Sequence, residues 1–457
     1  MIRKIHLSPF MLPILFFGVV IATGALLLNT DWSVGHRSIS WIDALFTATS
    51  ATCVTGLIVV DTGTFFTPFG QAVILGLIQL GGLGIMTYTS LVFYLWRRRV
   101  TLTDRIAVGQ SLLHDPTFKL GNFLIQLVLW TLIIETAGAA LLFLLDAERI
   151  SPYAAVFHSV SAFCNAGFSL YSDSFITWRN HWGINLVLML LIVLGGIGFA
   201  VLMEIKAYLS GRIPLLTSPA QSPHRRKLSW YATVVVKTSL FLILTGALGI
   251  YLAEYIGYQR HLPAGEAVLS ALFQSVTCRT AGFNTLDIGQ MTNVSLSLMI
   301  ILMFIGGASG SCAGGVKIST FRTMASFMWA QIIGRRQTVV GKYAMDENTL
   351  NRALSLTIFA GVIIFAATLL LNMTEGGDVP HPQIRGQYLD LLFEVTSAFG
   401  TVGLSTGITP QLSTTGKCII TLVMFVGRLG PILFLSVLQS LQEKKRFSWP
   451  EESMLIG

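Results

Sequence analysis

A short motif recurs four times along an otherwise apolar chain of 457 residues. Each copy ends in a loop that contains a glycine, and the four loops read V-T-G-L, N-A-G-F, T-A-G-F and T-V-G-L. A phenylalanine followed by a polar residue stands nine or ten positions before each glycine. One such tripeptide would be a weak signal, but four copies in the same context indicate an internally repeated fold.

The composition places these repeats in a membrane. Hydrophobic residues make up 53% of the chain and charged residues only 11%, whereas a soluble domain carries roughly 25% charged residues. The mean hydropathy is +0.69, and apolar runs of about 20 residues, each long enough to cross the hydrocarbon core, recur along the sequence. The first run, residues 9–28, is too long for a signal peptide and is expected to be retained.

The chain is therefore expected to be an all-α polytopic membrane protein with four pseudo-repeats around a central pore. Each repeat would hold a spanning helix, a short re-entrant helix with its glycine loop, and a second spanning helix. The repeats are assigned to residues 1–100, 101–212, 213–340 and 341–441, with a tail at 442–457. The expected segments are 9–28, 41–51 with loop 52–57, and 71–96; 120–145, 152–162 with loop 163–168, and 182–205; 232–255, 264–276 with loop 277–283, and 295–316 with its continuation; 350–371, 388–398 with loop 399–404, and 417–441.

The basic residues predict the orientation. The net charge of +8 could suggest nucleic-acid binding, but most of the 30 lysines and arginines lie near the two termini and in alternate loops. The positive-inside rule then places both termini and those loops in the cytoplasm of a cell-membrane protein. Eight spans give the same result, since an even number returns the chain to its starting side. We therefore expect membrane lipids, and no nucleic acid, around this chain.

The glycine loops have a physical reading. A helix that stops inside a membrane leaves unpaired carbonyl groups, which is tolerated where they line a cavity. Glycine allows backbone dihedrals that other residues avoid, and four such loops can form a ring of carbonyl oxygens that replaces the hydration shell of a monovalent cation. Helix capping alone would explain each glycine but not the repeat. The residues assigned to this selectivity filter are Val54, Thr55, Gly56, Asn165, Ala166, Gly167, Thr280, Ala281, Gly282, Thr401, Val402 and Gly403.

A second glycine-rich stretch, residues 305–316, interrupts the third repeat. Five glycines lie between Gly306 and Gly315, and each costs roughly 1 kcal/mol relative to alanine in a helix. We expect a non-helical segment that lines a cavity, with a packing kink as the alternative.

The motifs resemble the membrane subunits of the Trk/Ktr/HKT superfamily of potassium transporters, and KtrB-type subunits of bacteria in particular. The resemblance covers nearly the whole chain, including residues 40–57, 305–317 and 427–431 and the closing W-P-E-E-S-M-L-I-G. It implies potassium uptake, and it makes the loop 305–316 a movable gate beneath the filter. The gate residues would be Gly306, Gly307, Ala308, Ser309, Gly310, Ser311, Cys312, Ala313, Gly314, Gly315 and Arg428.

The resemblance also implies partners. It predicts a homodimer with the C-terminal tail near the interface, resting on a cytoplasmic ring of KtrA-like RCK subunits. That ring would bind ATP or ADP, or NAD(H), because this chain has no Walker motif and no G-x-G-x-x-G after a strand, and hence no nucleotide cofactor of its own. Sodium stimulation or symport is a further expectation. A serine in place of Gly56 accompanies sodium preference in plant members, so four glycines favour potassium.

Several single residues are assigned with alternatives. Arg428 is expected either to hold the gate loop through its carbonyls or to form an ion pair with Glu394 or Glu135. Arg279 is expected to bond carbonyls behind the filter. Four polar residues are expected to brace the filter rather than bind the ion, and they are Thr47, His158, Gln274 and Glu394.

The five cysteines are interpreted as small buried residues rather than disulfides. Cys53, Cys164 and Cys278 could form a metal site, but spacers are favoured. The sequence offers no H-E-x-x-H motif and no nucleophile–base pair, so an intramembrane enzyme is disfavoured. A sodium-selective channel of the same architecture is the remaining rival.

Overall fold

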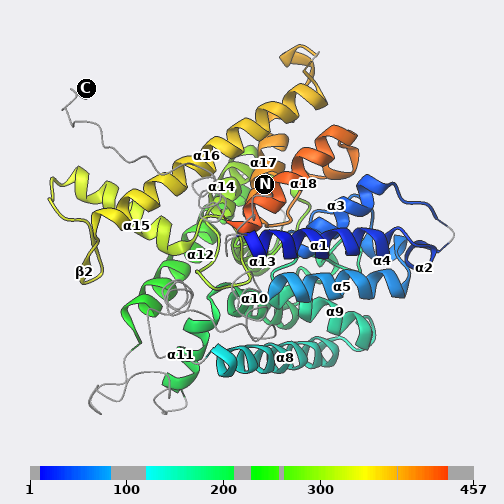
Figure 1. The fold of residues 1–457 in the computed structure, drawn as a ribbon, viewed down its shortest axis with the longest axis horizontal. Helices are drawn as coiled ribbons and strands as arrows, with labels where there is room; N and C mark the ends of the chain where they lie inside the picture. The colour runs from blue at the N-terminus through cyan, green and yellow to red at the C-terminus, as the bar shows by residue number, and fades with distance from the viewer. Residues whose placement is uncertain are drawn as a thin grey trace, which may run out of the picture.

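The computed structural model describes residues 11–35, 37–83, 120–209, 228–256, 262–377 and 379–430. Nearly all regular structure in these ranges is helical. The chain proceeds around a common centre, from α1 through α8 and α12 to α18, while α15 and one end of α16 extend to one side (Figure 1). Two very short strands, β1 (Val339–Val340) and β2 (Tyr343–Ala344), pair in an antiparallel hairpin between α15 and α16.

The helices fall into four successive sets. The first set comprises α1 (Met11–Leu28), α2 (Asp31–Val34), α3 (Trp41–Thr52), α4 (Thr62–Phe65) and α5 (Pro68–Gly82). The second set comprises α8 (Leu120–Leu145), α9 (Pro152–Phe163), α10 (Trp182–Gly196) and α11 (Phe199–Leu209). The third set comprises α12 (Trp230–Ile256), α13 (Ala264–Thr277), α14 (Asn293–Phe304) and α15 (Ile318–Ile332). The fourth set comprises α16 (Glu347–Glu375), α17 (Gln387–Gly400) and α18 (Thr414–Leu429). Short 3₁₀ turns lie at Ile176–Trp178, Ile288–Gln290, His381–Gln383 and Thr409–Gln411.

The short helices α3, α9, α13 and α17 lie at the centre and are largely buried. Hydroxyl groups start two of them, since Ser40 accepts a hydrogen bond from Asp43 N at 3.1 Å and Ser151 from Ala154 N at 3.2 Å. The phenylalanine of each repeat is fully buried, and these residues are Phe46, Phe157, Phe273 and Phe393. The motif phenylalanines therefore anchor the short helices in the core.

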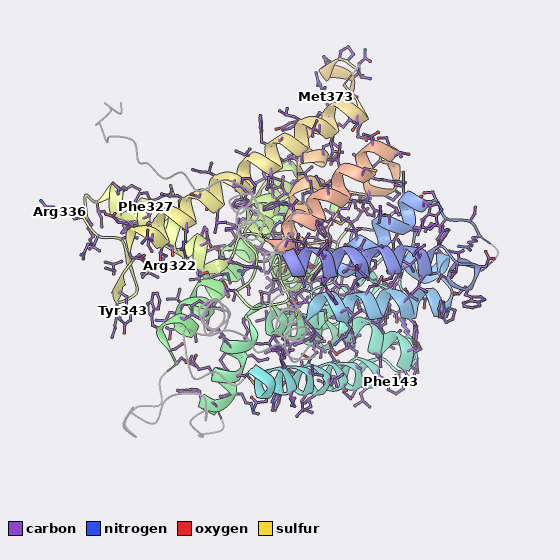
Figure 2. All side chains as sticks on the ribbon, viewed as in Figure 1. Phe143, Arg322, Phe327, Arg336, Tyr343 and Met373 are labelled. Carbon is purple, nitrogen blue, oxygen red and sulfur yellow. The ribbon has the colours of Figure 1, made fainter. Side chains whose placement is uncertain are left out.

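Three helices are long and apolar enough to cross a bilayer without interruption, counting only the described residues: Leu124–Leu145, Trp230–Tyr255 and Glu347–Glu375. Their outer faces carry exposed apolar side chains, such as Leu144 and Met373, and Figure 2 shows Phe143 and Met373 at the edge of the molecule. Apolar side chains on the outside and polar ones near the centre fit a lipid environment. The protein is an all-α polytopic membrane protein.

The prediction of one continuous helix over 182–205 is wrong. The chain bends by 112° between α10 and α11, at Gly198 with φ +87°. The break frees the carbonyl groups of Gly195 and Gly196 to accept hydrogen bonds from another segment, described below. The expected extensions of α5 to residue 96 and of α18 to residue 441 fall outside the described residues beyond positions 83 and 430.

The cysteine interpretation also needs one correction. Cys53, Cys164, Cys278 and Cys312 are buried, but Cys418 is exposed on α18. Its neighbours on α18 include Leu422, which is also exposed. Cys418 therefore lies on the outer surface of α18 and not in the core, despite its apolar sequence neighbours.

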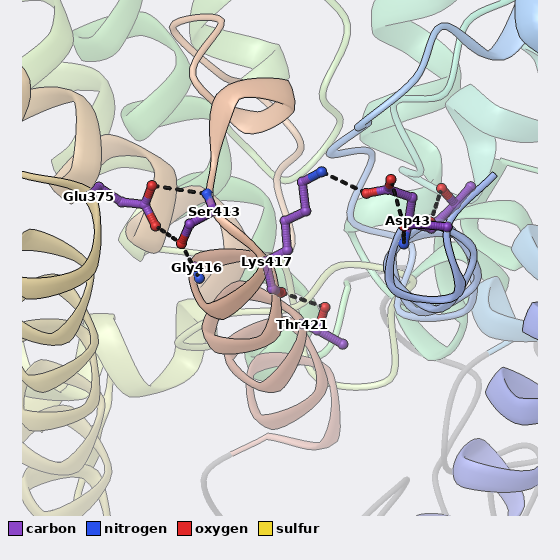
Figure 3. Close-up of polar contacts among 8 residues, drawn as sticks. Asp43, Glu375, Ser413, Gly416, Lys417 and Thr421 are labelled. Atoms are coloured by element: carbon purple, nitrogen blue, oxygen red, sulfur yellow. Dashed lines mark hydrogen bonds and ion pairs between the residues drawn. The ribbon is translucent and has the colours of Figure 1, made fainter. Parts of the chain in front are cut away.

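An ion pair joins the first and last sets, which no loop connects. Lys417 Nζ on α18 lies 2.7 Å from Asp43 Oδ1 on α3, with side-chain exposures of 15% and 21% (Figure 3). On the other side of α18, Glu375 accepts hydrogen bonds from Ser413 N at 3.0 Å and Ser413 Oγ at 2.6 Å. Because the chain itself links the other neighbouring sets, this contact helps to close the assembly noncovalently.

Neutralising this ion pair is expected to reduce stability. Asp43→Asn and Lys417→Gln should each lower the thermal unfolding midpoint in detergent, and the double variant should lose less than the sum of both. A double-mutant cycle should give a coupling energy of roughly 1 kcal/mol, as for other partly exposed pairs. Strictly additive losses would show that the two charges contribute independently.

Candidate functional site

The four glycine loops have the same backbone conformation. Each starts with a residue in the left-handed region, with φ between 50° and 69°, and two positions later has a glycine with φ between 70° and 93°. The first residues are Val54, Asn165, Thr280 and Thr401, and the glycines are Gly56, Gly167, Gly282 and Gly403. Residues other than glycine are strained at positive φ, so the first residue of each of the four loops has a strained backbone conformation.

The four glycines lie next to one another in a closed ring. A Cβ atom built on one glycine would lie 2.8–3.3 Å from the Cα of the next, in the order Gly56, Gly167, Gly282, Gly403 and back to Gly56. The same built atoms would meet the carbonyl oxygen that precedes each neighbouring glycine, namely those of Ala166, Ala281, Val402 and Thr55. Only glycine fits at these four positions, and the ring is therefore lined by backbone.

Hydroxyl groups at the ends of the short helices fix these loops. Gly56 N donates to Ser50 Oγ and Gly403 N to Ser397 Oγ, each at 3.1 Å. In the other two loops a hydroxyl group donates to the carbonyl after the glycine, from Ser161 to Phe168 at 2.8 Å and from Thr277 to Phe283 at 2.6 Å. Our sequence analysis missed these four residues. Their regular position, five or six residues before each glycine, was the available signal.

A second fourfold feature lies where the helices after each loop end. The sequence there reads G-G-L-G at 81–84, G-G-I-G at 195–198, G-G-A-S at 306–309 and G-R-L-G at 427–430. A Cβ on Gly81, Gly195 or Gly427 would overlap a carbonyl oxygen at or near the end of the neighbouring short helix. Sequence analysis recognised only the third copy. It follows from the alignment that Arg428 occupies a position that is glycine in the other three repeats.

The glycine-rich stretch 305–316 is non-helical and folds back on itself. Gly306 N donates to Val316 O at 2.9 Å, and Ile305 and Val316 form an isolated bridge. The loop binds the freed end of α10, because Ala308 N donates to Gly196 O at 2.9 Å and Cys312 N to Gly195 O at 3.1 Å.

Three cationic side chains hold this stretch by its carbonyl groups. Arg428, only 7% exposed, donates from Nη1 to Cys312 O and from Nη2 to Gly81 O. Arg279 Nη2 donates to Gly306 O at 2.9 Å, and Lys317 Nζ to Ala313 O at 2.6 Å. Arg428 thus bridges the glycine-rich stretch and the end of α5.

The polar residues one place after each motif phenylalanine do not all make the same contacts. His158 and Glu394 bind hydroxyl groups that follow their glycine loops. Thr47 instead donates to Asp43 O at 2.8 Å within its own helix. No group of three or more histidine, cysteine or acidic side chains suited to a metal ion occurs within the described ranges. The groups of this site that could contact an ion are therefore chiefly backbone carbonyl oxygens.

Comparisons with known proteins identify the family of this chain. Residues 5–448 match the TrkH family, described as cation transport proteins. The "Ktr system potassium uptake protein B" of Bacillus subtilis (strain 168) is 36% identical over 100% of this chain and 98% of its own length. The "Potassium/sodium uptake protein NtpJ" of Enterococcus hirae is 32% identical over 97% of this chain and 95% of its own.

The fold has a counterpart among solved structures. The crystal structure of the potassium transporter TrkH from Vibrio parahaemolyticus superposes with a TM-score of 0.72 at 20% identity, covering 95% of this chain and 86% of that one. With a family match over almost the entire sequence and full-length relatives above 30% identity, the chain belongs to the TrkH family of cation transport proteins.

Proposed function

We propose that this protein takes up potassium ions through one pore formed by a single chain. The observation that carries the proposal is the closed ring of Gly56, Gly167, Gly282 and Gly403, in which each glycine lies against the backbone carbonyl group that precedes the next glycine. Carbonyl oxygens can replace the water around a monovalent cation, and the negative ends of the four short helices favour positive charge. Relatives of full length are named as potassium uptake proteins, which supports the choice of ion.

A sodium-selective transporter of the same architecture is the second candidate. One full-length relative is named a potassium/sodium uptake protein. The proposal therefore includes potassium uptake coupled to sodium as a second form of the transport cycle. The four glycines favour potassium, because the ring is lined by backbone with no side chain narrowing it.

The stretch 305–316 is proposed to be the gate. It lies across the ends of α5 and α10, and hydrogen bonds from backbone groups and from Arg428 hold it there. Segments without helical hydrogen bonds can rearrange at lower cost than helices, and a cationic side chain next to the ion path opposes a cation. Under this proposal, the bonds from Arg428 and from the stretch to α10 are those that keep the gate closed.

We further propose a homodimer in the cell membrane with both termini in the cytoplasm. Control by a cytoplasmic nucleotide-binding ring of RCK type fits the name "Ktr system" carried by relatives, since a system implies more than one component. ATP, ADP or NAD(H) would bind to that ring and not to this chain.

Replacing Gly56 by serine tests both the filter and its ion. A Cβ at Gly56 would overlap Ala166 O, and φ is +93°, so we expect the preference for K⁺ over Na⁺ to fall about tenfold. The measurement is growth and Rb⁺ or Na⁺ uptake in a bacterium that lacks its own potassium uptake systems.

Gly35→Ser is the matched control, because Gly35 also has positive φ but only Thr67 Cγ2 nearby, at 3.6 Å. It should support growth like the unmodified protein. Failure of the unmodified protein to restore growth at low potassium, together with Na⁺ uptake, would favour the sodium-selective candidate.

A further inference from the structure

Besides the hydroxyl contacts described above, two of the four glycine loops are held beyond the glycine by a second side chain from their own short helix, and two are not. The supporting residue follows the motif phenylalanine, and its counterpart stands eleven residues later, beyond the glycine. The four pairs are Thr47 and Ile58, His158 and Ser169, Gln274 and Thr285, and Glu394 and Ser405. Three of the four counterparts are hydroxyl residues, which the sequence spacing alone makes visible.

The second loop is held by His158. Its Nε2 lies 3.0 Å from Ser169 Oγ and accepts a hydrogen bond from Leu170 N at 3.1 Å. Its Nδ1 lies 2.7 Å from Ala154 O, which assigns the ring proton to Nδ1 because a carbonyl can only accept. The ring also stacks on Tyr171 at 4.8 Å with an interplanar angle of 8°. The imidazole therefore fixes the chain two and three residues after Gly167.

The fourth loop is held by Glu394, which is fully buried. Thr409 Oγ1 donates to Glu394 Oε1, and Glu394 Oε2 has no hydrogen-bond partner within the described residues. Thr409 and Ser405 bond to each other at 3.0 Å. Through Thr409, which also bonds to Ser405, the carboxylate ties down the segment that follows Gly403, as the imidazole does for the segment that follows Gly167.

The other two loops lack this support. Thr47 bonds within its own helix, and its counterpart Ile58 has no polar group. Gln274 and Thr285 are buried, yet neither side chain has a hydrogen-bond partner within the described part of the chain. Since the glycines follow one another in chain order around the ring, the two supported loops stand opposite each other.

We propose that His158 and Glu394 are positioning residues that set the width of the filter along the diagonal between the second and fourth loops, and thereby its selectivity for potassium over sodium. This inference rests on the proposed function. A smaller ion needs its carbonyl ligands closer, so a loop fixed at its outer end resists the inward movement that sodium requires. The two loops without a second supporting side chain contribute ligands without setting that width.

The test removes partners of the two residues and leaves the residues themselves in place. Ser169→Ala and Thr409→Val should each lower the K⁺ over Na⁺ preference about tenfold, with little change in maximal Rb⁺ uptake, because each removes one or two buried hydrogen bonds. Ser169→Thr keeps a hydroxyl group and should restore the preference. Uptake is measured with the full-length protein in proteoliposomes, as KM and maximal rate for each ion.

Thr285→Val is the matched control. It removes the buried hydroxyl group eleven residues after Gln274, which has no hydrogen-bond partner among the described residues. It should change the preference by less than about twofold. Equal effects of Thr285→Val and Ser169→Ala would overturn the proposal, as would unchanged selectivity in Ser169→Ala and Thr409→Val. If Ser169→Ala fails to fold, Thr409→Val decides alone. If the unmodified protein transports no potassium, the proposed function fails instead.

Discussion

Alanine at Gly403 is expected to reduce potassium uptake by about two orders of magnitude. A Cβ there would overlap Thr55 O and come within 2.9 Å of Gly56 Cα, and Gly403 has φ +92°. Both neighbours are backbone atoms of the adjacent first loop, so they cannot rotate away as a side chain would. The first and fourth loops would have to separate, which opens the ring where an ion should be surrounded. Rb⁺ uptake by cells or proteoliposomes measures this loss.

Gly407→Ala separates the clash from the backbone strain. Gly407 has a similar φ of +97°, but nothing lies within 4 Å of a Cβ built there. It should cost about 1–2 kcal/mol of stability for the left-handed conformation and leave the uptake rate within about twofold. If both variants lose transport equally, strain alone is responsible, and the ring of backbone contacts is not what Gly403 protects.

The positions of the loops were accessible from the sequence because they depend on local chemistry. A glycine at a positive φ and a buried phenylalanine each leave a signal in the residue type, and the repeat multiplied that signal by four. The observed α8 begins and ends where the apolar run does, at Leu120 and Leu145. Predictions that depended only on a residue and its immediate sequence neighbours therefore placed the helices and glycine loops close to their observed positions.

The break after α10 was missed for a different reason. Its cause is a contact with a segment more than 100 residues later, where Ala308 N and Cys312 N take the carbonyl groups of Gly196 and Gly195. Hydropathy treats residues 182–205 as one apolar run, because Gly-Gly-Ile-Gly hardly lowers the average. The repeated glycine pair was visible, but it gains meaning only when the four copies are compared.

The partner of Arg428 was likewise beyond the sequence. From the sequence, the buried guanidinium of Arg428 could contact either carbonyl groups or a carboxylate, because both kinds of oxygen accept its hydrogen bonds. The structure shows its bonds to Cys312 O and Gly81 O. Whether these bonds hold a gate shut is a question of function, and it leads to the second large expected effect.

Arg428→Gln should raise uptake in the absence of any cytoplasmic regulatory subunit by roughly 10- to 100-fold. Hydrogen bonds from a charged donor contribute about 1.5–3 kcal/mol each, and the variant loses the bridge between the stretch 305–316 and α5 as well as a positive charge next to the proposed ion path. A factor of ten corresponds to about 1.4 kcal/mol, so weakening the bridge by one such bond is enough for the lower figure. Rb⁺ flux into proteoliposomes that contain this chain alone measures the effect.

Arg428→Lys distinguishes the bridge from the charge. Lysine keeps the positive charge but lacks the planar fork with which arginine reaches two carbonyl groups at once. If the bridge holds the gate, this variant should leak nearly as much as Arg428→Gln. If repulsion of the cation is what matters, it should stay closed. Flux that is low and equal in both variants and in the unmodified protein would remove Arg428 from the gate, since neither its bonds nor its charge would then limit transport.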